Sequence, residues 1–116
     1  MSTNTPVEEF LAQWKVSLQK MRTEAPDVAR VFGGLHVTLM KEGSLTAREK
    51  ELIAMAVGMA QGCTECIYLH AEGALKAGAT RGQVVEAAGV AVMMAGGPAF
   101  VHLPAVLEAL DQLQRR

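Results

Sequence analysis

Apolar residues recur every three or four positions along most of this chain, between short breaks of glycine and proline, and this pattern constrains the fold most strongly. Half of the 116 residues are apolar, yet the chain holds one Trp, one Tyr and three Phe. The apolar side chains are mostly Ala, Val, Leu and Met, without the runs of β-branched and aromatic residues that mark strands. The sequence therefore predicts an all-α fold.

The glycine and proline breaks divide the chain into five or six predicted helices. Thr46 with Glu49, and Thr80 with Gln83, have the spacing of a capping box and mark two helix starts. The predicted helices cover residues 7–22, 26–42, 46–60, 63–78, 80–95 and 98–113, the last with a bend or restart near Pro104. No internal repeat or linker interrupts them, so residues 1–116 form one predicted domain.

Two segments, Leu52–Ala60 and Val84–Ala95, are apolar on nearly every side. A helix of this kind is expected to be buried all round. We interpret the methionines of these segments as core filling: Met55, Met59, Met93 and Met94. Two such helices are more than a monomer of this size covers, so the sequence predicts a homo-oligomer.

Charge and hydropathy exclude several classes of protein. With 11 basic and 12 acidic residues and no basic stripe, nucleic acid is not an expected partner. Met1–Phe10 lacks the plan of a signal peptide, which predicts a cytoplasmic location. The uncharged stretch Ala87–Leu107 is interrupted by Gly96, Gly97 and two prolines, so we expect a buried helix there and no membrane span.

Cys63 and Cys66 are the two cysteines of the chain, and His70 follows four residues later. Residues at these spacings are neighbours on one helical face, so the three side chains can form one site. The pattern favours thiol chemistry, in which one thiolate attacks and the second cysteine closes a disulfide. In the cytoplasm that disulfide would be transient.

Two arguments assign the attacking thiol differently. Cys63 lies at the predicted helix start, where unpaired N–H groups favour a thiolate. Cys66 has His70 one turn away, and that imidazole can accept its proton. The spacing alone leaves both assignments open.

Three other interpretations of the cysteine pair and His70 compete with thiol chemistry. A metal site would have three ligands, one fewer than a structural zinc site, so no metal and no cofactor are expected. Ile67 stands where a haem-attachment motif needs histidine. The cysteines could also be structural core residues. His36 and His102 stand alone and are predicted to be packing or interface histidines.

A longer pattern supports thiol chemistry. It consists of Leu45-Thr46-Ala47-Arg48-Glu49-Lys50-Glu51-Leu52-Ile53-Ala54, Gly62-Cys63-Thr64-Glu65-Cys66, His70, Gly78-Ala79-Thr80 and Gly96-Gly97-Pro98. This pattern, over about half the chain, resembles the carboxymuconolactone decarboxylase family and, more narrowly, its AhpD-like alkylhydroperoxidase branch.

The resemblance implies an AhpD-like helical bundle that assembles as a trimer or hexamer, with a dithiol that reduces peroxides or exchanges disulfides. Cys66 would face the peroxide, Cys63 would resolve the oxidised sulfur, and His70 with Glu51 would relay the proton. An external thiol reductant would restore the dithiol, and no cofactor is implied.

One position departs from that branch. Its best-characterised peroxidases carry histidine directly before the second cysteine, where this chain has Glu65. An ionised acid there raises the pKa of a nearby thiol, which speaks against efficient peroxide reduction and leaves another disulfide open as the substrate. Other branches decarboxylate a small lactone without a cofactor and generally lack the cysteine pair. Tyr68 is expected to pack against neighbouring helices and not to react.

Overall fold

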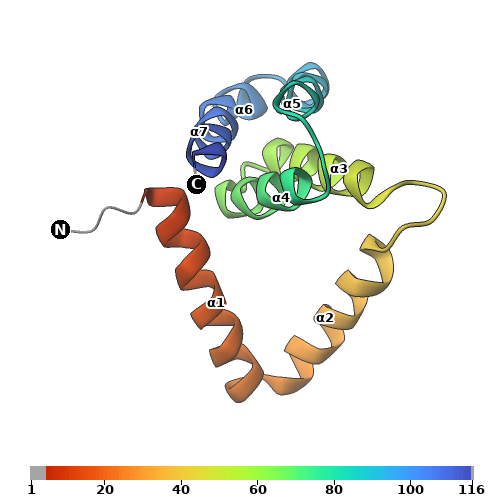
Figure 1. The fold of residues 1–116 in the computed structure, drawn as a ribbon, viewed down its shortest axis with the longest axis vertical. Coiled ribbons are helices and arrows are strands. Elements are labelled where there is room, and N and C mark those ends of the chain that lie inside the picture. The colour runs from red at the N-terminus through yellow and green to blue at the C-terminus, as the bar shows by residue number, and fades with distance from the viewer. Residues whose placement is uncertain (1–4, 116) are drawn as a thin grey trace.

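The all-α prediction is confirmed. The computed structural model describes residues 5–115, which contain helices and no strand (Figure 1). The helices are α1 (Pro6–Glu24), α2 (Pro26–Met40), α3 (Ala47–Ala60), α4 (Thr64–Lys76), α5 (Arg81–Ala95), α6 (Gly97–Phe100) and α7 (Leu103–Gln114). The last predicted segment, residues 98–113, forms two helices. The chain turns at Val101 and His102 after the one-turn α6 and restarts as α7, close to the restart expected near Pro104. Residues 1–4, part of the segment without a signal-peptide plan, lie outside the described range.

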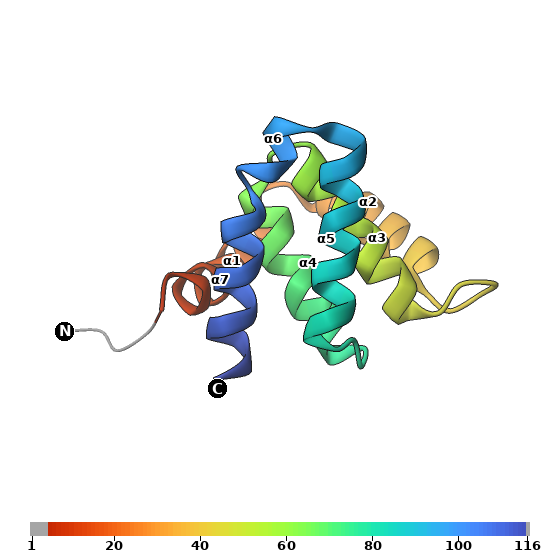
Figure 2. The ribbon, with the colours of Figure 1, turned by 90° about the horizontal axis from the view of Figure 1, so that it is seen from above.

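The chain is arranged as a body and an arm. Helices α3, α4, α5, α6 and α7 gather into the body, while α1 and α2 form the two legs of a V (Figure 1). Seen from above, α1 lies beside α7 and α2 lies beside α3, on opposite sides of the body (Figure 2). We call α1 and α2 together the arm.

Two apolar clusters hold the described part of the chain together. The larger joins α3, α4, α5 and α7 through fully buried side chains: Met55, Met59, Ile67, Val84, Val106 and Leu110. The smaller attaches the start of the arm to α4 and α7: Val7, Leu11, Ala71, Ala109 and Leu113. The first half of α1 is therefore part of the core, and the rest of the arm extends away from it.

Both predicted capping boxes are confirmed, at Thr46 for α3 and at Thr80 for α5. In the first, the backbone N–H and the hydroxyl of Thr46 donate to Glu49 Oε1 at 2.8 and 3.0 Å. These bonds to the charged form lower the pKa of Glu49. The cap therefore contributes its full stability above the ordinary pKa of a glutamate and loses it as the pH falls through the lowered value.

The prediction of all-round burial is wrong for a single copy of the chain. Ile53 and Val57 of α3 are half exposed, and Met93 and Met94 of α5 are 72% and 76% exposed. Only Met55 and Met59 fill the core as expected. The reason is geometric, because α3 and α5 each pack one face on their neighbours and residues 5–115 supply no further layer to cover the other.

Helix α2 carries more exposed large apolar side chains than any other described helix. No residue of α2, all of which the structure describes, is buried. One side of the helix carries a stripe of exposed large apolar side chains: Val28, Val31, Phe32, Leu35 and Leu39. We call these five residues the α2 stripe.

The far end of α2 is fastened to α3 by one lysine. Lys50 Nζ donates to the carbonyl oxygens of Leu39 and Lys41, at 2.8 and 2.6 Å. These carbonyls end α2, where a cation is favoured by the helix dipole. Lys50 therefore determines where the second leg of the arm meets the body.

Among residues 5–115, no helix combines the length and the apolarity needed to cross a membrane. The uncharged stretch Ala87–Leu107 is divided among α5, α6 and α7, with Gly96 at a positive φ of 72° ending the first of them. The stretch is therefore not one continuous span, and it is also not the single buried helix that we expected, because residues such as Met93 and Phe100 are exposed.

A buried glutamine fastens the arm to α7 and provides a test of this arrangement. The backbone N–H of Val7, in the first turn of α1, donates to Gln112 Oε1 at 2.9 Å. We expect Gln112→Ala to lower the free energy of unfolding by about 1–3 kcal/mol, because a buried donor loses its partner. Urea unfolding measures this. Gln114→Ala, at an exposed position of the same helix, is the control, and equal losses in both variants would contradict the assignment.

Candidate functional site

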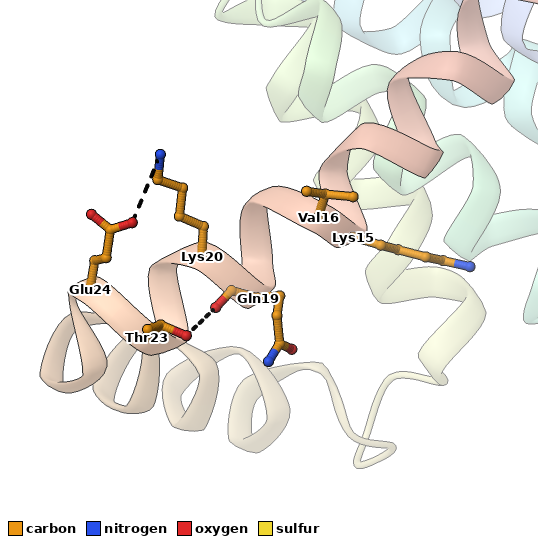
Figure 3. A pocket seen from close by; sticks show the side chains of 6 residues that line it. All are labelled: Lys15, Val16, Gln19, Lys20, Thr23 and Glu24. Carbon is orange, nitrogen blue, oxygen red and sulfur yellow. Dashed lines mark hydrogen bonds and ion pairs between the residues drawn. The ribbon is translucent and has the colours of Figure 1, made fainter.

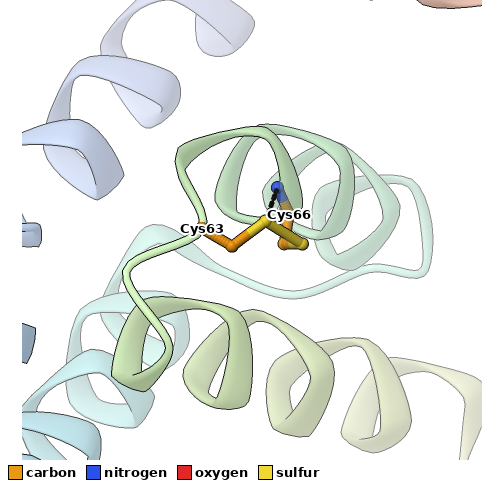
Figure 4. The surroundings of a disulfide bond; sticks show 2 residues. All are labelled: Cys63 and Cys66. Atoms are coloured by element: carbon orange, nitrogen blue, oxygen red, sulfur yellow. Dashed lines mark hydrogen bonds between the residues drawn. A yellow bond between two sulfur atoms is a disulfide. The ribbon is translucent and has the colours of Figure 1, made fainter.

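The two cysteines form a disulfide at the start of α4 (Figure 4). Their Cα atoms are 5.3 Å apart, within the usual range for such a bond. Cys63 is the N-cap residue, as the sequence predicted, and its sulfur accepts a hydrogen bond from the backbone N–H of Cys66 at 3.2 Å. The structure thus places the sulfur of Cys63 against the positive end of a helix dipole.

His70 and Glu51 are brought together from two different helices. His70 Nδ1 lies 2.9 Å from Glu51 Oε2, and the two side chains are 23% and 16% exposed. When Glu51 is ionised it can only accept, so Nδ1–H is the donor and Nε2 is left as the free ring nitrogen of His70. The carboxylate thus holds the imidazole in one orientation, an arrangement that is suitable for proton transfer.

Two glycines let α3 and α4 approach closely enough to build this site. A Cβ added to Gly58 of α3 would lie 2.7 Å from the Cβ of Cys66, and one added to Gly73 of α4 would lie 2.6 Å from the Cδ of Glu51. Glu51 and Gly58 are two turns apart on α3, as are Cys66 and Gly73 on the antiparallel α4. Cys66 and Glu51 therefore each lie against a glycine of the opposite helix.

The other two histidines have different positions. His102 Nδ1 donates to the carbonyl oxygen of Pro98 at 2.8 Å, and its ring lies against Gly62, whose φ is +69°. It packs at the turn between α3 and α4, as expected. His36 is exposed on α2, but its ring is 6.4 Å from that of His70, centre to centre, with 29° between the planes. The sequence did not predict this proximity.

Tyr68 packs against the arm. Its ring meets the edge of Phe10 of α1, with 5.9 Å between the ring centres. Burial, and then the negative charges of Glu108 and Glu65, raise the pKa of Tyr68. The phenol therefore stays protonated at neutral pH, which agrees with the packing role predicted for it.

A hollow in the described surface lies away from these residues. It has a volume of about 550 Å³ and runs along the second half of α1, lined by Lys15, Val16, Gln19, Lys20, Thr23 and Glu24 (Figure 3). One helix of the arm supplies all of these residues, and none of the site residues lines the hollow. Nor do residues 5–115 contain a cluster of three or more histidine, cysteine or acidic side chains that could hold a metal ion.

Comparison with known proteins identifies the class to which this fold and this site belong. The sequence profile of the carboxymuconolactone decarboxylase family matches residues 26–109. The chain therefore belongs to that family, as its sequence pattern indicated.

Relatives and solved structures agree with this assignment. An uncharacterised protein of Cupriavidus necator is 35% identical over 88 residues, which cover 76% of this chain and 78% of the relative. The alkyl hydroperoxide reductase AhpD of Corynebacterium kroppenstedtii is 29% identical over 68% of this chain and 45% of its own length. The crystal structure of an apo carboxymuconolactone decarboxylase family protein from Legionella pneumophila has a TM-score of 0.87 at 34% identity, covering 92% of this chain and 96% of that one. A family member from Thermotoga maritima has the same fold, with a TM-score of 0.83 at 21% identity and coverage of 92% and 91%.

Gly73→Ala tests whether the glycine contact positions Glu51. Alanine favours a helix over glycine by up to about 1 kcal/mol, so the fold should be kept. The added methyl group would displace the Glu51 carboxylate from His70. We expect the ring-proton resonances of His70 to change in NMR spectra as they do in Glu51→Gln.

Gly89→Ala is the matched control, because this helical glycine has open space around its Cα. Its His70 resonances should equal those of the wild type. An unchanged His70 spectrum in Gly73→Ala would show that Glu51 does not depend on this glycine.

Proposed function

We propose that this protein is a dithiol oxidoreductase that reduces alkyl hydroperoxides or exchanges disulfides, and so has an antioxidant role. One observation carries the proposal. The Cys63–Cys66 disulfide lies at the start of α4, and the same helix carries His70, whose ring contacts the carboxylate of Glu51. The name of the AhpD relative, an alkyl hydroperoxide reductase, supports the peroxide as substrate.

In the proposed cycle, Cys66 is the attacking group. Its thiolate attacks one oxygen of the hydroperoxide and the O–O bond breaks, which oxidises the sulfur to a sulfenic acid and reduces the peroxide to an alcohol. His70, held by Glu51, donates the proton that the departing oxygen needs. Cys63 then attacks the sulfenic acid, a disulfide forms and water leaves.

The position of Cys63 suits it to the resolving role. An external dithiol reductant would attack the sulfur of Cys66, so that Cys63 leaves as a thiolate. The backbone N–H of Cys66 already points at the sulfur of Cys63, at 3.2 Å, and would stabilise that charge. A stabilised thiolate leaves faster. The helix start therefore suits Cys63 to leave, and the neighbouring His70 suits Cys66 to attack, in two different steps of one cycle.

Turnover of tert-butyl hydroperoxide with dithiothreitol tests this cycle. We expect the wild type to consume the peroxide and Cys66→Ser to lose the activity. His70→Ala and Glu51→Gln should each slow turnover, by up to about 10²–10⁴-fold, because they remove general acid–base assistance. Peroxide consumption at matched protein concentration measures all four proteins.

Equal activity in wild type and Cys66→Ser would contradict the mechanism. If neither protein consumes peroxide, disulfide substrates are the next to test, because Glu65 stands where the peroxidases carry histidine. The lactone decarboxylation of other branches would follow only if both sulfurs proved dispensable.

Assembly into a trimer or hexamer belongs to the same proposal. The α2 stripe exposes side chains such as Phe32, at 65%, and a monomer rarely leaves a contiguous apolar surface of this kind uncovered. A second copy of the chain is the proposed cover, in a cytoplasmic protein that also binds an external thiol reductant.

Light scattering on a sizing column tests the assembly. The wild type should have the mass of three or six chains. Phe32→Glu should shift it toward the monomer, because a charge cannot be buried unpaired in an apolar interface. Val37→Glu, on the opposite side of α2, should leave the mass unchanged, and a monomeric wild type would reject the assembly.

A further inference from the structure

The feature that the proposed cycle leaves unused is His36, the histidine of the arm. Its ring lies nearly parallel to that of His70, with 6.4 Å between the centres. We infer that His36 is a proton carrier that connects His70 with the solvent. This inference rests on the proposed function, because it assigns the route by which the site receives its protons.

The position of His36 follows from the way α2 is turned. Ala29 and Met40 are the two residues of α2 that are partly shielded, and His36 lies on the same side of the helix. His36 also borders the α2 stripe, four residues after Phe32 and three before Leu39, on the side that faces His70. The two bonds of Lys50 to the end of α2, four residues beyond His36, keep this side against α3.

The spacing of the rings suits a bridging water. Two hydrogen bonds of about 2.8–2.9 Å each, through one water, can join ring nitrogens of histidines that do not touch. Glu51 holds Nδ1 of His70, so Nε2 is the nitrogen available for the bridge. His70 is 23% exposed, whereas His36 is an exposed residue. Imidazole also gains and loses protons near neutral pH.

Every turnover needs such a route. The peroxide, two electrons and two protons give an alcohol and water; a disulfide substrate needs the same electrons and protons to give two thiols. A dithiol that attacks as its thiolates delivers the electrons and leaves both protons in the solvent. In the inferred route His36 takes a proton from solvent and passes it through water to His70. His70 then gives it to the departing oxygen of the peroxide, or to the sulfur of Cys66 when that sulfur leaves the mixed disulfide with the reductant.

Several charged side chains of α3 and α4 have partners of their own. On α3, Glu51 accepts from His70, and Lys50 donates to the end of α2. On α4, Glu72 pairs with Lys76 at 3.6 Å. Of the three imidazoles in the described chain, His36 is the exposed one, and it lies beside His70.

The test measures reduction of the Cys63–Cys66 disulfide itself, in which Cys66 leaves the mixed disulfide and takes a proton from His70, whether or not the protein has a peroxidase activity. The oxidised protein is mixed with excess dithiothreitol in dilute buffer, quenched at intervals with acid, and its alkylated thiols are counted by mass. We expect His36→Gln to slow reduction about tenfold, less than a group that touches the reacting atoms. Added imidazole should restore the rate, because it replaces the lost carrier.

Two controls make the outcome decisive. Val37→Gln, next to His36 on the polar side of α2, should reduce at the wild-type rate with or without imidazole. In a His70→Ala background, His36→Gln should cause no further slowing, because the route then ends at the missing ring. A wild-type rate in His36→Gln, or a loss that imidazole does not restore, would overturn the inference. Neither result bears on the Cys66→Ser experiment, so the proposed function is judged separately.

Discussion

The close approach of α3 and α4 is the constraint on which the rest of the site depends. Gly58 leaves space for the side chain of Cys66, and Gly73 leaves space for that of Glu51. These two contacts lie two turns apart along one antiparallel pair of helices. With any side chain at Gly58, the helix would meet the Cβ of Cys66, an atom that cannot move without moving α4. The two cysteines and the His70–Glu51 pair are therefore placed by one contact between helices, and both pairs would shift if that contact changed.

A second consequence of the chain's composition is the division into body and arm. Small side chains such as Ala71 and Ala109 let the helices of the body pack tightly. Too little chain remains to cover the outer faces of α2, α3 and α5. The apolar surface left over, and the buried hydrogen bond from Val7 to Gln112, show an arm that is rooted in one core and extends beyond it.

Local signals in the sequence were sufficient for the helices and for half of the site. The cap at Thr46, the N-cap position of Cys63 and the spacing of Cys66 and His70 are properties of single segments. The pairing of His70 with Glu51 depends on the register of two helices, and only resemblance to a known family suggested it. The proximity of His36 could not be predicted, because it depends on the angle of the arm. Met93 was misplaced because its segment is apolar on both the covered and the uncovered side.

The contact between Gly73 and Glu51 also constrains how these two positions can change during evolution. A glycine in the middle of a helix is a poor choice for stability, and here it is tolerated because the opposite helix carries a long acid. A descendant without the acid at position 51 could replace the glycine at position 73 freely. A descendant that replaced the glycine first would displace the carboxylate at position 51. The two positions are thus expected to be inherited together, so that glycine at the later position marks the chains that keep a working carboxylate at the earlier one.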